Sequence, residues 1–476
     1  MILLVICLLL AAGCSWFSDE DVRRYQRQKP LAKVIDELPD LRLPVSDERK
    51  PTREEVVRAY ERVYGQIIDR IENQAVGKRL ADLEMFAAEE KDAAGSGEPY
   101  DQALAMYQQL VRDPEHVGQA KILYQIARVY DLKGDTPTAR SYLDQLIERF
   151  PDSEYESEAR FRRAEMAFSA EDYRSARDDY EAVVDKGPDT QFWMNAHYMM
   201  GWAQFKLGEL EGGLSNFFTV VDVLLEKGAQ PLTTTETELL NDSFRVTTLA
   251  LAYLDGPATL AGEMRSLEHP HWQYLAYEKL AQDYLDKERY LDNVTTWQMF
   301  IDENPLDARA PDAHIGMIKT LIDADFPSQV QPKKEAFIRG YGIRSEFWQV
   351  HDADSRAHYV DTLKTYLQET ATLNHALAQA IVVVDESDAR IKAFLDSAAW
   401  YSELIETFPA DPQVPDHVFL LGEAYTEAFD DEQAILAYRR LVREFPGHTN
   451  ADEAGYAMVL GFTRLLDSRP DDMILF

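Results

Sequence analysis

The sequence predicts an all-α protein in which helix hairpins stack into an α-solenoid, and three observations support this. Apolar residues recur with the period of a helix in two segments far apart in the chain, 121–151 and 415–446. Each segment contains two such stretches with a turn between them. An alanine in the second stretch precedes a proline by twelve residues, in the pairs Ala139–Pro151, Ala176–Pro188 and Ala434–Pro446. Recurrence of this kind indicates a repeat protein, in which each hairpin buries its apolar face only against its neighbours.

The segment 121–151 illustrates the expected hairpin. Gly134 breaks the first helix, and Pro151 ends the second. The apolar face of the first helix is Leu123, Ile126, Ala127 and Tyr130, and that of the second is Ala139, Leu143 and Leu146.

Residues 415–446 repeat both faces. The first helix carries Val418, Leu421, Gly422 and Tyr425, and the second carries Ala434, Tyr438 and Leu441. We expect the small residues to let two helices approach closely and the aromatic residues to fill the space beside them.

These spacings resemble those of the tetratricopeptide repeat family, which implies a right-handed solenoid with a concave groove lined by the first helix of each hairpin. A unit at 272–305 matches the pattern, although Asn293 stands at a position for a small residue. We also expect a second helix around Tyr401 and Pro409, and a degenerate first unit at 72–114. In the unit at 272–305, the residues that match the family pattern are Tyr277, Leu280, Ala281, Tyr284, Trp297 and Pro305. A further unit, which lacks the terminal proline, matches at Met200, Gly201, Gly208, Gly213 and Phe217.

The resemblance also implies which residues line the groove. Tyr198 and Trp202 are neighbours at i and i+4, with Phe205 nearby, and they are the strongest candidates for partner contact. The alternative is that they pack against the next hairpin. The full set of expected groove residues is Tyr124, Arg128, Arg162, Tyr198, Trp202, Glu423 and Thr426.

Three stretches, 222–268, 311–345 and 346–396, do not fit the repeat. We interpret them as irregular solenoid helices, with a separate inserted domain as the alternative. The predicted organisation is a signal peptide at 1–13, a lipidated tether at 14–52, an N-terminal array at 53–225, an irregular section at 226–396 and C-terminal repeats at 397–476.

The N-terminus has the features of an export signal. Ile2 to Leu10 is an apolar run too short to span a bilayer, and three small residues separate it from Cys14. This resembles the lipobox of bacterial lipoproteins, which implies cleavage before Cys14 and attachment of acyl chains, such as palmitate, to it. Ser15 points to the outer membrane in that family. No Lys or Arg precedes the run, so either the true start lies upstream or the signal is atypical. An uncleaved apolar N-terminus is the alternative.

The C-terminal region suggests an incomplete unit. Asn450 to Leu466 has the pattern of another first helix, with Leu460 and Gly461 in the Leu-Gly position, and the chain then reaches Met473 to Phe476. We expect either that the sequence is a piece of a longer protein or that this end docks on a partner.

Composition excludes several classes of function. Acidic residues outnumber basic ones 84 to 49, which gives a net charge of −35 and argues against nucleic acid or an anionic lipid surface as the main partner. The two cysteines, Cys7 and Cys14, exclude a disulfide framework and a cysteine-based metal site in the body.

No cofactor, metal or catalytic site is expected. His351, Asp354 and His358 share the spacing of one helix face and are the strongest candidates for metal ligands, but a solvated polar face is the preferred interpretation. His269 and His271 flank a proline in a predicted loop. The motifs H-E-x-x-H, G-x-S-x-G and G-x-x-x-x-G-K are all absent from the sequence.

The combined features resemble the periplasmic repeat lipoproteins of Gram-negative bacteria. The run Ile147 to Ser153, followed by Tyr155, is similar to the repeat lipoprotein of the outer-membrane β-barrel assembly complex, and the repeat proteins of the Tol–Pal system are a further comparison. The resemblance implies a non-enzymatic scaffold, anchored to the outer membrane and facing the periplasm, that binds envelope proteins.

Two alternatives remain. One is an accessory of polysaccharide export, pilus or motility apparatus. The other is an envelope glycan hydrolase with a helical guide domain, although the Glu-Ser pairs Glu156-Ser157 and Glu386-Ser387 both adjoin predicted helices of the array.

Overall fold

The computed structural model describes residues 51–64, 66, 70–93, 100–112, 118–226, 231–381 and 388–468. Within these ranges the regular secondary structure is helical, with no strand. The chain divides into two compact units, residues 1–116 and 117–476. Cys14, the predicted signal peptide and the segment Met473–Phe476 lie outside the described residues, as does the predicted tether up to residue 50.

The first unit contains three described helices: α4 (Arg53–Tyr64), α5 (Arg70–Ala93) and α6 (Asp101–Val111). Helix α5 packs against both of the others. Gly77 allows this contact, because a Cβ atom added there would lie 2.7 Å from the Tyr64 ring and 3.3 Å from the Leu110 side chain. The α5–α6 pair occupies the place of the degenerate unit expected at 72–114.

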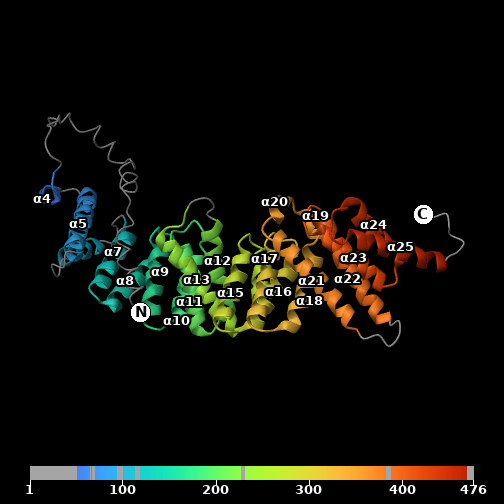
Figure 1. The fold of residues 1–476 in the computed structure, drawn as a ribbon. Helices are drawn as coiled ribbons and strands as arrows, with labels where there is room; N and C mark the ends of the chain where they lie inside the picture. The colour runs from blue at the N-terminus through green and yellow to red at the C-terminus, as the bar shows by residue number, and fades with distance from the viewer. Residues whose placement is uncertain are drawn as a thin grey trace. The chain divides into compact units, whose positions relative to one another are not determined.

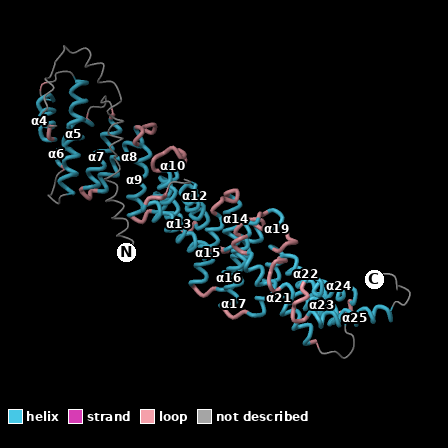
Figure 2. The backbone as a smooth tube through the Cα atoms, turned by 45° about the horizontal axis from the view of Figure 1, so that its top comes forward, coloured by secondary structure: helices cyan, strands magenta, loops and turns pink. Residues whose placement is uncertain are grey.

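In the second unit, most consecutive helices pack side by side in chain order (Figures 1 and 2). We call the odd-numbered helices α7–α17 and α21–α25 first helices, and the even-numbered helices that follow them second helices. The regular hairpins are α7 (Gln119–Leu132) with α8 (Thr136–Arg149), α9 (Glu156–Ser169) with α10 (Tyr173–Val184), α11 (Trp193–Leu207) with α12 (Leu210–Glu226), α15 (Gln273–Asp286) with α16 (Tyr290–Glu303), α17 (Ala310–Asp323) with α18 (Pro327–Tyr341) and α23 (Val414–Glu427) with α24 (Asp431–Glu444). The predicted all-α solenoid of helix hairpins is confirmed.

The same backbone turn joins the two helices of most hairpins. The residue before the N-cap takes a positive φ, as Gly134 (77°) and Glu171 (63°) do. The next amide then reaches back to a carbonyl five residues earlier, as from Asp135 to Tyr130 at 2.9 Å. Asp135 also accepts a hydrogen bond from the Thr138 amide and so caps the second helix. The break predicted at Gly134 is therefore correct, but a glycine is not essential, since Phe429 takes the same conformation at 58°.

Small residues set the spacing inside each hairpin. A Cβ added to Gly422 would lie 2.4 Å from the Tyr438 ring, so the aromatic ring of α24 rests directly on the backbone of α23. Gly201 has the same relation to Phe217 of α12, at 3.1 Å. Asn293, the expected exception, is buried and donates from Nδ2 to the Ala281 carbonyl at 2.8 Å, whereas its Oδ1 has no hydrogen-bond partner among the described residues.

The section from 231 to 381 is more regular than the sequence indicates, because α17 and α18 form an ordinary pair. Its departures are α13 (Thr234–Tyr253), which is long, and α14 (Pro257–Ser266), which packs more on α15 and α16 than on α13. Residues 346–356 form two short helices, α19 (Glu346–Val350) and α20 (Ala353–Arg356). Long helices follow them, α21 (Val360–Ala380) and α22 (Asp388–Thr407), and the whole section belongs to the second compact unit.

The last described helix, α25 (Ala451–Ser468), packs on α24. No helix among the described residues combines the length and apolar character required to cross a membrane.

Gly422→Ala should lower the thermal stability of the protein, because the added methyl group has no space beside Tyr438. Overpacking of this kind costs about 1–3 kcal/mol. Gly262→Ala in α14 is the matched control: nothing lies within 4 Å of its added Cβ, and the change favours the helix by up to about 1 kcal/mol. Thermal unfolding followed by circular dichroism checks both, and an unchanged melting temperature for Gly422→Ala would contradict the packing.

Three histidines lie in the core: His197, His314 and His375. Each has a ring nitrogen with no hydrogen-bond partner among the described residues, and burial lowers the pKa of all three. For His314, which packs edge-on against Phe337 and Tyr341, burial and the nearby Lys333 lower the pKa to about 4. His314 is therefore neutral in the folded protein, whereas in the unfolded chain it takes up a proton below about pH 6.5.

The protein should lose stability as the pH falls from about 6.5 towards 4, because only the unfolded chain gains the His314 proton in that window. Between pH 7 and 5 this residue accounts for about 2 kcal/mol. His314→Leu should remove part of that loss, and His271→Leu, at an exposed position, should not. Urea unfolding at the two pH values measures the difference, and equal acid sensitivity of His314→Leu and the unmodified protein would refute the assignment.

Candidate functional site

The expected groove residues lie on first helices, where side chains connect one first helix to the next. The Tyr124 hydroxyl of α7 donates to the Glu158 carboxylate of α9, and its ring stacks on Tyr155 with centroids 5.8 Å apart. Burial raises the pKa of Tyr124 above its usual range. Tyr124 is only 7% exposed, so it packs between hairpins and offers little surface to a partner.

Arg162 and its neighbours form a charged cluster on α7 and α9. Arg162 pairs with Glu165 at 3.2 Å, and both side chains are about one-third exposed, at 32% and 34%. Burial raises the pKa of Glu165 and of Asp131, with Arg162 opposing the shift at both carboxyl groups. Arg128 is near enough to act electrostatically on Tyr124. The cluster contains both positive and negative side chains, and the Arg162–Glu165 ion pair neutralises part of its charge.

A second group of aromatic and charged side chains lies on α11 and α13. The Tyr198 hydroxyl donates to Asp242 Oδ2 at 2.6 Å, and Asp242 also accepts from Arg245 at 2.6 Å. The Arg245 guanidinium carbon lies 5.8 Å from the centre of the Trp202 ring. The Trp202 side chain is half-buried, and the Arg245 side chain is 59% exposed. We call the four residues Tyr198, Trp202, Asp242 and Arg245 the α11–α13 face.

Two of these four residues were not predicted. Asp242 and Arg245 belong to the stretch 222–268, which lacks the repeat pattern and was therefore not aligned with the groove positions. The sequence does contain one indication of this pair: Asp242 and Arg245 are three residues apart, a spacing that places an acidic and a basic side chain on one helix face.

Glu423 and Thr426 of α23 lie far from this face in the chain and do not join it. Thr426 Oγ1 donates to the Gly422 carbonyl at 2.9 Å and is 3.3 Å from the Tyr438 hydroxyl, so it packs inside its hairpin. Burial raises the pKa of Glu423, and the nearby carboxylates of Glu453 and Glu427 add to the effect. The structure therefore divides the expected groove residues among the α7–α9 cluster, the α11–α13 face and α23.

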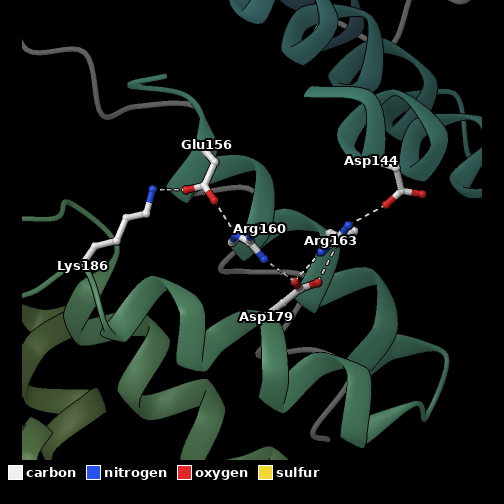
Figure 3. Close-up of polar contacts among 6 residues, drawn as sticks. All are labelled: Asp144, Glu156, Arg160, Arg163, Asp179 and Lys186. Carbon is white, nitrogen blue, oxygen red and sulfur yellow. Dashed lines mark hydrogen bonds and ion pairs between the residues drawn. The ribbon is translucent and has the colours of Figure 1, made fainter. Parts of the chain in front are cut away.

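A charge network holds α9 in place between α8 and α10 (Figure 3). Arg163 of α9 binds Asp179 of α10 through two contacts, at 2.5 and 2.7 Å, and Asp144 of α8 at 2.7 Å. Arg160 joins Asp179 to Glu156, which also pairs with Lys186. Asp179 and Glu156 are buried, so the network desolvates its carboxylates but supplies each with cationic partners.

The histidines considered as metal ligands have other partners. His351 Nε2 lies 3.0 Å from the Leu306 carbonyl and its ring stacks on Phe347, whereas His358 faces Asp312 at 3.5 Å. Asp354 is in the first turn of α20. In the part of the chain that the structure describes, no group of three or more His, Cys, Asp or Glu residues is arranged to hold a metal ion.

Comparison with known protein families supports the repeat assignment. Residues 97–221 match the model of a tetratricopeptide repeat-like domain, and residues 418–448 match that of a tetratricopeptide repeat. The chain contains tetratricopeptide-type repeats. The second match covers the α23–α24 hairpin, whose Gly422–Tyr438 contact is described above. No match was found among curated proteins.

Several solved structures are similar in part. A structure of Naa15/Naa10 bound to HypK-THB has 13% identity and a TM-score of 0.29, and the alignment covers 88% of this chain and 64% of that chain. A tetratricopeptide repeat protein from Parabacteroides merdae has 12% identity and a TM-score of 0.24, with 72% and 100% covered. A complex of the TPR2AB domain of yeast Sti1 with pHSP90 has 14% identity and a TM-score of 0.23, with 72% and 98% covered.

Asp179→Ala should destabilise the protein by about 3 kcal/mol, because Arg163, only 19% exposed, loses its principal partner. Asp178→Ala is the matched control, since this neighbour on the same helix is 59% exposed and its ion pair contributes less than about 1 kcal/mol. Thermal unfolding of the two variants measures the contrast, and equal effects would show that the network does not stabilise the repeat.

Proposed function

We propose that this protein is a non-enzymatic scaffold that binds a partner protein or peptide on the α11–α13 face. The observation that carries the proposal is the position of Trp202, a half-buried aromatic ring on a first helix beside an exposed arginine. Tryptophan, tyrosine and arginine are the residues most often responsible for binding energy at protein interfaces. Asp242 holds both Tyr198 and Arg245, so these side chains lose little conformational freedom when a partner binds.

The repeats support the same general role. A stack of hairpins presents its first helices along one side, and extended peptides or helices bind across several of them. The matches to tetratricopeptide repeat models fit a protein-interaction scaffold.

We further propose that the scaffold is anchored to the outer membrane through lipid on Cys14, faces the periplasm and organises an envelope assembly machine. This rests on the sequence alone: the apolar run, the small residues before Cys14 and the proline-containing tether. A tether of about 40 residues spans roughly 35 Å and would hold the body, which carries the negative charge, away from anionic head groups.

Trp202→Ala in the full chain should reduce recovery of the partner by about tenfold or more, because loss of an interface tryptophan commonly costs at least about 2 kcal/mol. Trp400→Ala is the matched control: Trp400 is also half-buried, with the Arg339 guanidinium 5.4 Å from its ring centre, but it lies on a second helix. Crosslinking in intact cell envelopes, followed by mass spectrometry, measures the recovery.

Equal recovery with both variants would reject the α11–α13 face, and glycan hydrolysis by the purified protein would reject the scaffold role. Mass spectrometry of the same fractionated membranes tests the anchor, for which acyl chains on an N-terminal Cys14 are expected. An intact Met1 in a soluble fraction would reject it.

A further inference from the structure

Helix α25 has an exposed apolar face opposite the side that packs on α24. Its small residues Ala451, Ala454 and Gly461 are buried, and Gly461 lies against Ile435 of α24. The opposite side carries four large apolar residues at helical spacing, which we call the α25 stripe. They are Tyr456, Val459, Leu460 and Leu466, with exposed fractions of 67%, 55%, 40% and 46%.

This face differs from the one that α23 presents to α24. Aligning the first residues of the helices, Val414 and Ala451, gives an offset of 37 residues and places Val459 at the position of Gly422. In α23 that glycine lets the ring of Tyr438 rest on the backbone. A valine there prevents such a close approach. The predicted register, with Leu460 and Gly461 as the Leu-Gly pair, is therefore wrong, because Gly461 lies against Ile435 of the preceding helix α24, whereas Gly422 lies against Tyr438 of the helix that follows its own.

The stripe is consequently suited to ordinary side-chain packing against a helix whose axis lies about 8–10 Å away. Its four residues occur over three turns on one side of α25, so a matching helix would need an apolar stripe of the same period.

The charges around the stripe indicate which helix would fit. Asp452 and Glu453 are exposed in the first turn of α25, and Glu453 is near enough to Glu423 to influence its ionisation. The cation on this helix, Arg464, is paired with Asp431 at 2.5 Å. Among the described charged residues of α25 itself, those without an ion-pair partner are therefore negative, and this favours a basic partner. A second copy of this chain is disfavoured, because each copy carries a net charge of −35.

We propose that the α25 stripe is a second docking site, which binds an amphipathic helix of another protein with Lys or Arg residues beside its apolar face. It is separate from the α11–α13 face and does not depend on the function proposed for that face. The partner helix would bury Tyr456, Val459 and Leu460, and its cations would lie beside Asp452 and Glu453.

The test uses the full chain and two fluorescent helical peptides with leucines at i, i+3, i+4 and i+7. One has lysines flanking the leucines, and the other has glutamates in the same places. Fluorescence anisotropy should show saturable binding of the lysine peptide and much weaker binding of the glutamate peptide. Leu460→Asp should weaken lysine-peptide binding by at least about tenfold, because a charge enters the apolar contact.

Leu436→Asp is the matched control, since Leu436 is 44% exposed on α24 and lies outside the stripe. Both variants add one negative charge, so attraction by charge alone would strengthen binding equally in the two. The proposal instead predicts that Leu460→Asp loses affinity for the lysine peptide and that Leu436→Asp does not.

Five results would overturn the proposal, and four of them come from the peptide-binding and sedimentation experiments. These are no binding of the lysine peptide, equal affinity for both peptides, equal effects of the two substitutions, and a dimer in sedimentation experiments that Leu460→Asp dissociates. A variant that lacks residues 469–476 tests whether this segment of the chain occupies the stripe and blocks the peptide. If so, the variant should bind the peptide much more tightly, and the stripe would then be assigned to that segment instead of to another protein. Trp202→Ala should leave peptide affinity unchanged, which separates this site from the α11–α13 face.

Discussion

The close approach of the two helices in each hairpin is the contact on which the rest of the second unit depends. Gly422 under Tyr438 and Gly201 under Phe217 show its form: an aromatic ring of the second helix rests on a backbone position without a Cβ. Because interiors are packed to the density of crystals, this contact sets the distance between the helices and therefore the spacing of the next hairpin. Stability then accumulates from neighbour to neighbour along the stack.

Polar interactions connect neighbouring helices within and between hairpins. The network around Arg163 and Asp179 connects α8, α9 and α10 (Figure 3), and the bond from Tyr198 to Asp242 connects α11 to α13. Burying an unpaired charge costs free energy, and these contacts give the buried charged groups partners. The Tyr198–Asp242 bond also connects the two first helices that carry Trp202 and Arg245, the residues of the proposed binding face.

Local patterns in the sequence were sufficient to predict the hairpins. The helical period of Leu123, Ile126 and Tyr130, the break at Gly134 and the recurrent alanine depend on neighbouring residues only. The site was predicted less well. Tyr198 and Trp202 are found on the proposed face, but Tyr124 and Thr426 are used in packing. A position on a first helix does not reveal which neighbour a side chain will meet, and that neighbour is a property of the stack.

The sequence by itself determined the helical class, the hairpin period and the strongly acidic character of the protein, because composition and periodicity are properties of the chain alone. Only the tertiary structure decided that α17 and α18 form a regular pair, that Asp242 and Arg245 join Tyr198 and Trp202, and that Gly461 faces α24. Each of these depends on contact between residues distant in sequence, where the packing of whole helices selects one of several faces that local spacing leaves equally possible.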